Sequence, residues 1–212
     1  MKSLLLKEYN LAINKFYIYS PIMFAAMLLI PDWIYVIAFM YLFWLTIPAV
    51  YSEYNAQNDL IFTQTLPVRK NDIVISKVLA IVFNELLYIL AAIIFAVISN
   101  IIYGPKRLFL DLNPAFFGHI LVMFSIFNLI FFPKYFKTAY FFGKAAILGS
   151  VFAISYALII EGLNIGLVSV NNVIESNNGL IQLGLLVIGI LIYSLGLFIT
   201  IKKSITNFEN RI

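Results

Sequence analysis

Two ionisable side chains, Glu85 and His119, lie inside long apolar stretches of the sequence. An ionisable group within a membrane is costly, and such groups usually face protein or a water-filled cavity where protons or ions bind. Glu85 could therefore line a translocation pathway together with Asn84 and Asn128, and there take up a proton or contact a cationic substrate. The same side chains could instead tether neighbouring helices, which is the interpretation we favour, and His119 fits an interfacial polar contact.

The motifs of the common hydrolytic and metal-dependent enzymes are absent from the sequence. The chain has no cysteine and a single histidine, so the usual ligand sets for zinc cannot be assembled. No G-x-x-x-x-G-K-[S/T] occurs, since Gly143-Lys144 lacks the rest of the motif, and neither H-E-x-x-H nor G-x-S-x-G is present. We therefore expect no catalytic residue, no bound metal, no cofactor and no ATP hydrolysis in this chain.

Residues 62–77, FTQTLPVRKNDIVISK, place one proline, three cations and one carboxylate between two apolar stretches. Ser52 can cap a short helix that ends near Thr65, because a residue that precedes a proline avoids the α conformation. Asn71 can cap a second helix that continues without interruption into the next apolar stretch. The sequence thus predicts a short helix joined at Pro67 to a long one.

The composition is that of an integral membrane protein. Hydrophobic residues make up 63% of the chain and charged residues 11%, against roughly 25% charged residues in soluble domains. A membrane-spanning helix needs about 20 apolar residues, and the period-two alternation of a barrel is missing. We therefore expect an all-α, single-domain membrane protein over residues 1–212, with no nucleic-acid partner and with spans at 16–30, 33–51, 78–102, 115–132, 145–160 and 180–201.

The distribution of basic residues predicts the orientation of these spans. If the N-terminus is cytoplasmic, twelve of the fourteen Lys and Arg residues lie on the cytoplasmic side, and only Lys106 and Arg107 lie outside. Cytoplasmic loops carry such an excess of Lys and Arg. Both termini and residues 52–77 are therefore expected in the cytoplasm.

The segment before the first span has an apolar and a polar face at helical spacing. Lys7 lies on the polar face. The apolar face is formed by Leu5, Leu6, Tyr9, Ala12, Ile13 and Phe16. This pattern predicts an amphipathic helix that lies in the cytoplasmic interface or packs on the bundle.

Small residues recur at every fourth position of the fifth span. They are Ala145, Gly149, Ala153 and Ala157. Such a row lets helix backbones approach closely in lipid, so a close helix contact is expected here. The partner could lie in this chain or in a second copy.

Residues 53–77 resemble the cytoplasmic loop of the ABC-2 type transporter permease family. That family carries an acidic residue after its second span, a Leu-Pro-hydrophobic-Arg-Lys turn, and an Ile-Val followed by a Lys that opens the third span. The matching positions are Glu53, Leu66, Pro67, Arg69, Lys70, Ile73, Val74 and Lys77. The chain is similar to small bacterial permeases of this family, including exporters of amphipathic peptides such as phenol-soluble modulins or bacteriocins, although it lacks the longer external domain of many relatives.

The resemblance implies one subunit of an ATP-driven exporter in a bacterial plasma membrane. A separate ATPase subunit would bind ATP and Mg²⁺ and dock on the short helix, called a coupling helix, while two permease chains would enclose the pathway. The residues that we expect to take part in coupling to the ATPase are Glu53, Asp59, Leu60, Ile61, Phe62, Leu66, Pro67, Arg69, Lys70 and Lys77.

Two other functions fit the same sequence. A self-sufficient secondary carrier would use Glu85 for ion coupling, but residues 1–103 and 104–212 show no similarity of the kind that repeats produce. The second is a membrane assembly subunit that transports nothing and has no translocation pathway. Transport by the purified chain alone, or the presence of a partner ATPase, would separate these functions.

Overall fold

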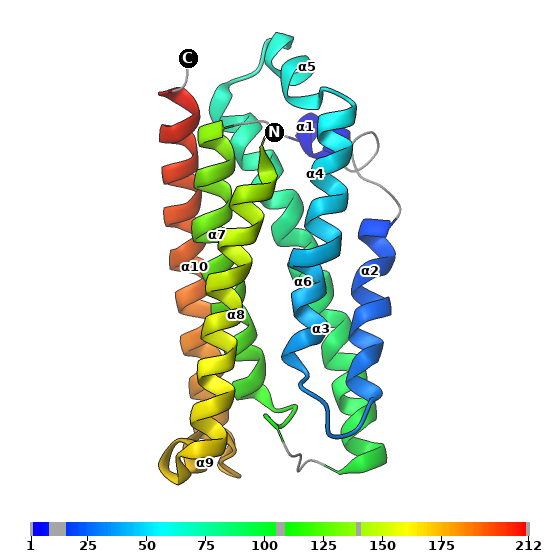
Figure 1. Ribbon diagram of the computed structural model, residues 1–212, viewed down its shortest axis with the longest axis vertical. Helices are drawn as coiled ribbons and strands as arrows, with labels where there is room; N and C mark the ends of the chain where they lie inside the picture. Colours follow the sequence, from blue (N-terminus) through cyan, green and yellow to red (C-terminus); the bar gives the residue numbers. More distant parts are fainter. Residues whose placement is uncertain (1, 9–15, 105–108, 139–140, 211–212) are drawn as a thin grey trace.

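The computed structural model describes residues 2–8, 16–104, 109–138 and 141–210 (Figure 1). Every regular element in these ranges is a helix, which confirms the predicted all-α class. The elements are α1 (Lys2–Lys7), α2 (Phe16–Ala25), the 3-10 helix η2 (Ala26–Leu29), α3 (Val36–Tyr41), the π-helical η3 (Leu42–Thr46), α4 (Ile47–Ala56), α5 (Asp59–Thr65), α6 (Lys70–Tyr103), α7 (Pro114–Thr138), α8 (Phe142–Gly166), α9 (Val168–Ile174) and α10 (Gly179–Glu209).

Five apolar helical segments are long enough to cross a membrane, and a shorter apolar helix, Phe16–Leu29, precedes them. The five segments are Val36–Ala56, Lys70–Tyr103, Pro114–Thr138, Phe142–Gly166 and Gly179–Glu209. Each of the last four contains the corresponding predicted span and extends beyond it at both ends. α6 has 34 residues and is therefore about 51 Å long, which exceeds the ~30 Å hydrocarbon layer of a membrane.

The long helices run side by side along the longest axis of the molecule (Figure 1). α1 and α5 lie at the end where α10 terminates, and α9 lies at the opposite end. We refer to these as the α5 end and the α9 end. Of the predicted N-terminal amphipathic helix, α1 is observed, while residues 9–15 lie outside the described ranges, as do Lys106 and Arg107.

The helix boundaries around residues 52–70 differ in part from the prediction. α4 continues through Ser52 to Ala56, so Ser52 lies within a helix and does not cap one. The chain breaks instead at Asn58, which adopts the left-handed conformation (φ 49°, ψ 34°) that asparagine tolerates better than most residues. The predicted end at Thr65 is confirmed, whereas the long helix begins at Lys70, one residue before the cap expected at Asn71.

α7 and α10 make the most extensive helix contact in the described chain. Their backbones approach closely where two glycines meet, because a Cβ added to Gly189 would lie 2.5 Å from the carbonyl oxygen of Gly118. Seven residues further along each helix, Gly196 faces Ser125. Small residues at such interfaces allow close packing in lipid, and the contact between Gly118 and Gly189 has no signal in the local sequence pattern.

The predicted row of small residues on α8 faces α7 of the same chain. Ala145, Gly149, Ala153 and Ala157 are all buried. A Cβ added to Gly149 would lie 3.0 Å from the ring of Phe127, so the small side chain leaves room for this aromatic residue. The close contact is thus made within the chain.

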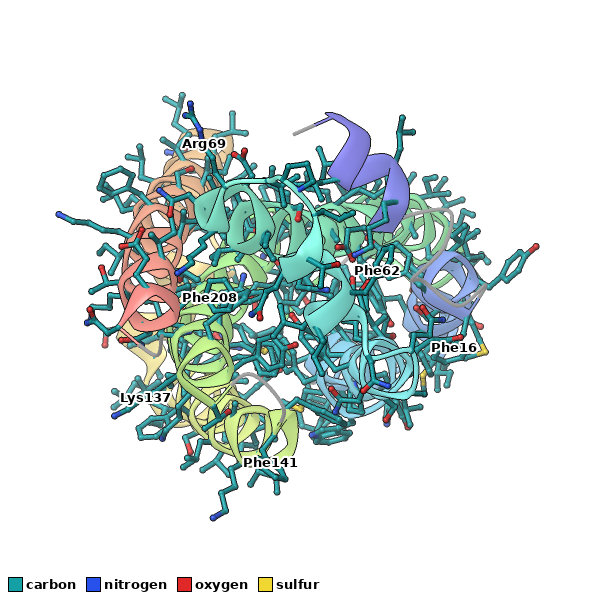
Figure 2. All side chains as sticks on the ribbon, turned by 90° about the horizontal axis from the view of Figure 1, so that it is seen from above. Phe16, Phe62, Arg69, Lys137, Phe141 and Phe208 are labelled. Atoms are coloured by element: carbon teal, nitrogen blue, oxygen red, sulfur yellow. The ribbon has the colours of Figure 1, made fainter. Side chains whose placement is uncertain are left out.

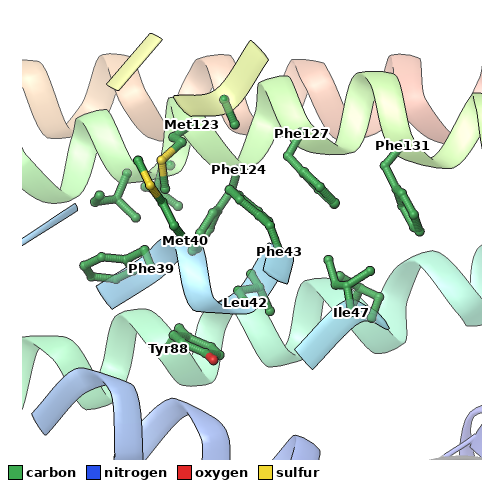
Figure 3. Packing of buried hydrophobic residues seen from close by; sticks show 14 of the residues in the cluster. Phe39, Met40, Leu42, Phe43, Ile47, Tyr88, Met123, Phe124, Phe127 and Phe131 are labelled. Carbon is green, nitrogen blue, oxygen red and sulfur yellow. The ribbon is translucent and has the colours of Figure 1, made fainter. Parts of the chain in front are cut away.

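Aromatic side chains fill the space between the α3–α4 segment and α7 (Figure 3). The rings of Phe43 and Phe127 stack with centroids 4.1 Å apart, and Phe127 stacks on Phe131 at 5.1 Å. Phe39 meets Phe124 edge to face at 6.1 Å. Offset and edge-to-face pairs of this kind add to the apolar burial and hold the two helical segments in register.

We expect Gly189→Ala to lower the thermal unfolding midpoint of the purified protein. The added methyl group would collide with the Gly118 backbone, and overpacking of this kind costs about 1–3 kcal/mol. The matched control is Gly184→Ala on the same helix, because a Cβ there meets no atom within 4 Å. Equal midpoints for both variants would contradict the close approach of α7 and α10.

Candidate functional site

α5 lies across one end of the bundle, where Figure 2 shows Phe62 near the middle of the face and Arg69 toward its edge. One side of α5 is buried, since Asp59 and Leu60 are 4% and 5% exposed. The other side presents Ile61 and Phe62, which are 46% and 56% exposed. α5 is thus a short amphipathic helix with large apolar side chains on its outer surface.

Asp59 lies at the centre of a buried ionic cluster that joins three helices. Its Oδ1 lies 2.5 Å from Nζ of Lys7 on α1, and its Oδ2 lies 2.5 Å from Nζ of Lys77 on α6. Oε1 of Glu8 lies 3.4 Å from Lys7 Nζ and 3.6 Å from Lys77 Nζ. Two cations and two carboxylates therefore balance in the ionic cluster (Lys7, Glu8, Asp59 and Lys77).

Further polar contacts compensate for the burial of the ionic cluster. Lys77 Nζ lies 3.4 Å from the ring centroid of Tyr54, and Lys7 donates a 2.6 Å hydrogen bond to Thr63 Oγ1. Burial by itself raises the pKa of Asp59, but the ammonium groups of Lys77 and Lys7 outweigh it and hold that pKa below its usual value. Asp59 is therefore charged at neutral pH, and removal of either partner leaves a buried charge unpaired.

The residues expected at the contact with an ATPase do not all lie on one surface. Asp59, Leu60 and Lys77 are buried, Glu53 and Leu66 are half-buried, and Ile61, Phe62, Pro67, Arg69 and Lys70 are exposed. The buried three fix α5 against α1 and α6 and cannot contribute to its outer surface. We therefore expect these three residues to serve ATPase coupling by positioning α5 and not by touching a partner.

Glu85 joins three helices near the middle of the bundle. Its carboxylate accepts hydrogen bonds from Nδ2 of Asn128 on α7, at 2.9 and 3.1 Å, and from the hydroxyl of Tyr193 on α10, at 2.5 Å. Glu85 is 1% exposed. Glu85 therefore links neighbouring helices, as the favoured interpretation of the sequence expected. Of the two asparagines named with it, Asn128 is the one that it contacts.

Asn84 belongs to a different contact from its neighbour Glu85. Its Nδ2 donates a 2.6 Å hydrogen bond to the carbonyl oxygen of Tyr17, and the Tyr17 hydroxyl donates to the carbonyl of Ala80. These bonds attach α2 to α6. His119 lies within the bundle, where its Nδ1 is 2.9 Å from the hydroxyl of Tyr156 on α8, so the predicted polar contact is made to another helix.

A second group of polar side chains gathers at the α9 end around Glu175. Its Oε1 accepts hydrogen bonds from the amide of Asp111 at 3.1 Å and from Nδ2 of Asn164 at 3.3 Å. Its Oε2 accepts a 3.2 Å bond from Nδ2 of Asn113. Burial, and then the adjacent carboxyl of Asp111, raise the pKa of Glu175 to about 7.

Sequence reasoning missed several of these residues. The helical pattern places Lys7 on the polar face of the N-terminal helix, but its pairing with Asp59 spans more than fifty positions and leaves no local signal. Tyr193 reads as one more aromatic residue of an apolar span, and its contact with Glu85 spans 108 positions. Glu175 lies in a segment whose asparagines indicate only a turn.

The described residues offer no ready metal centre. In that part of the chain, no group of three or more His, Asp or Glu side chains is placed to hold a metal ion.

Comparison with known proteins adds one match that covers nearly the whole chain. The sequence model of the family described as ABC-2 family transporter protein matches residues 3–204. No curated protein matches the chain, and no solved structure does.

We expect Asp59→Asn to destabilise the protein by about 3–5 kcal/mol, because it leaves Lys7 and Lys77 buried without their counter-charge. The double variant Asp59→Asn with Lys77→Met should lose less than the sum of the two single variants. Thermal unfolding in one detergent measures all three. The exposed Glu209→Gln is the matched control, and strict additivity of the pair would contradict a coupled ionic cluster.

We expect the packing of α9 to weaken as the pH rises toward about 7. The pKa of Glu175 is raised in the folded state, so its stabilising contribution is complete below the ordinary glutamate pKa and is lost as the pH passes the folded value. Amide hydrogen exchange in α9, corrected for the intrinsic rate, should accelerate between about pH 4.5 and about pH 7 and level off above that range.

Glu175→Gln should abolish this pH dependence, because the amide cannot ionise. The other carboxylates that face the same loop are Asp111 and Glu161, and Glu161 accepts a hydrogen bond from the amide of Leu110 at 3.3 Å. Glu209→Gln at the opposite end should keep the wild-type profile. An unchanged profile in Glu175→Gln would show that another group titrates.

Proposed function

The chain belongs to the ABC-2 family of transporter proteins, and on that premise we propose that it is the membrane-spanning permease subunit of an ATP-driven exporter. A separate ATPase subunit binds ATP and Mg²⁺, and two permease chains form the pathway in a bacterial plasma membrane. The substrate is an amphipathic peptide or another hydrophobic compound. The observation that supports this proposal is the position of α5, which is fixed to α6 by ions and presents apolar side chains outward.

The outer surface of α5 and the turn after it fit a protein partner. Ile61 and Phe62 are large apolar side chains on the exposed side of α5, and Pro67, Arg69 and Lys70 follow in the exposed turn. An apolar centre flanked by cations matches a shallow groove with acidic residues at its rim. We assign this docking surface (Ile61, Phe62, Pro67, Arg69 and Lys70) to the ATPase.

The ionic cluster can transmit a movement of the docking surface to the membrane-spanning helix α6. Asp59 ties α5 to Lys77, which lies in the third turn of the 34-residue helix α6. A displacement of α5 by the ATPase would therefore move the start of α6 and not merely a flexible loop. The Lys7 contact couples α1 to the same movement.

The structure gives less support to a self-sufficient carrier that uses Glu85. Such a carrier needs its ion-coupling group to exchange a proton or cation with water during the cycle. Glu85 is 1% exposed, and both of its oxygens accept hydrogen bonds from neighbouring helices. We therefore treat Glu85 as a tether within the bundle.

We expect the paired substitution Ile61→Asp with Phe62→Asp to abolish co-purification with the partner ATPase and the stimulation of its ATP hydrolysis. The carboxylates would remove the apolar centre of the docking surface, and truncation of such a centre typically costs at least about 2 kcal/mol. Both side chains are exposed, so the permease itself should fold and elute as the wild type does.

The control for this experiment is Ser52→Asp, which adds a carboxylate at an exposed position of α4 outside the docking surface. It should keep wild-type assembly. If the Ile61 and Phe62 variant retains full assembly and ATPase stimulation, α5 is not the docking element.

A further inference from the structure

An apolar groove opens on the side of the bundle between α6, α7 and α10. Its volume is about 710 Å³, within the ~300–1,000 Å³ typical of ligand sites. Ile93 and Val97 of α6, Phe117 of α7 and Ile190 of α10 belong to its lining. Ile93, Val97 and Ile190 are themselves exposed, so the groove faces the surroundings of the bundle, where lipid would lie.

A small polar pocket continues the groove toward the α9 end. The pocket has a volume of about 120 Å³ and shares Asn100, Leu112 and Asn113 with the groove. Asp111 and Glu175 contribute carboxylates to its lining. Within the ranges that the structure describes, neither hollow is lined by a lysine or an arginine.

We propose that the two joined hollows bind a single-chain cationic amphiphile, with its apolar tail in the groove and its cationic head at Asp111 and Glu175. The groove is walled by aliphatic and aromatic side chains and supplies burial for the tail. The pocket supplies carboxylate and amide oxygens for the head. The groove and the pocket meet at Asn100 and Asn113, where the tail of the ligand would join its head.

The charge at the pocket distinguishes this ligand from ordinary membrane lipid. A phospholipid in the groove would bring its phosphate toward Asp111 and Glu175, where like charges repel. A cationic head meets the opposite charge and needs no counterion from the protein. Burial, and then the neighbouring carboxyl of Asp111, raise the pKa of Glu175, and a cation between the two carboxyls would favour the ionised form of Glu175.

The role of this site in transport rests on the proposed function. The α9 end is opposite the docking surface on α5, so the groove would open to the outer leaflet if α5 is cytoplasmic (Figure 1). The groove would then hold the exported amphiphile before its release. Binding itself requires only this chain and can be measured without an ATPase.

The absence of native cysteine allows a direct test on the full chain in lipid nanodiscs. Val97→Cys places one fluorescent label inside the groove, and the probes are bromododecyl-trimethylammonium and bromododecyl sulfate, which share a quenching tail and differ in head charge. We expect saturable quenching by the cation at a concentration about tenfold or more below that needed for the anion. Asp111→Asn with Glu175→Gln should remove this preference, because it removes both the attraction for the cation and the repulsion of the anion.

A groove-filling variant and its control test the place of the tail. Ile190→Trp, added to the labelled chain, should abolish saturable quenching by both probes because the indole occupies the groove. Val187→Trp lies on the same helix, is exposed and does not line the groove, so it should leave quenching unchanged. Both variants should elute and unfold as the parent does.

Three outcomes would overturn the proposal. Equal quenching by the cation and the anion would show a lipid-like site with no preference for a cationic head. Loss of quenching in Val187→Trp as well as Ile190→Trp would show that the probes report on bulk lipid. Disulfide formation between two Val97→Cys chains, with no quenching by either probe, would show that a second copy covers the groove.

These outcomes are independent of the ATPase experiment on α5. If the chain assembles with the ATPase but shows no preference for the cation, the proposed function stands and the proposed ligand is wrong. If the chain binds the cation but does not assemble with an ATPase, the proposed ligand site stands and the proposed exporter function is wrong.

Discussion

The ion pair between Asp59 and Lys77 is the interaction on which the placement of α5 depends. A helix of seven residues is too short to be stable on its own, so tertiary contacts must hold it. Asp59 provides them in two directions, to Lys7 on α1 and to Lys77 on α6, at a largely buried site. Because a buried charge cannot lose its partner cheaply, α1, α5 and the start of α6 are held together as one unit.

Polar side chains and small residues organise the interior of the bundle in complementary ways. The Glu85 carboxylate links α6 to α7 and α10, while Gly118 and Gly189 let the backbones of α7 and α10 approach closely. In lipid there is no hydrophobic force between helices, so packing and hydrogen bonds must hold them together. The aromatic rings of Phe43 and Phe127 then fill the remaining space toward α3 and α4.

The described charged side chains are arranged differently at the two ends of the molecule. At the α5 end, two lysines balance two carboxylates in the ionic cluster, and the apolar side chains of Ile61 and Phe62 are left for a partner. At the α9 end, the carboxyls of Asp111 and Glu175 lie side by side next to an apolar groove. The ionic cluster suits a rigid mechanical contact, whereas the carboxyls of Asp111 and Glu175 suit a cationic ligand, and α6 connects the two ends.

The sequence by itself determined the all-α membrane class and the break at Leu66-Pro67, because apolar length and proline geometry are local properties. It also offered Asn128 as a partner of Glu85 and predicted a close contact along the small residues of α8. The tertiary structure alone decided that Asp59, Leu60 and Lys77 are buried, that α4 passes through Ser52, and that Tyr193 completes the Glu85 contact. These outcomes depend on side chains brought together from distant positions, and such pairings leave no periodic signal along the chain.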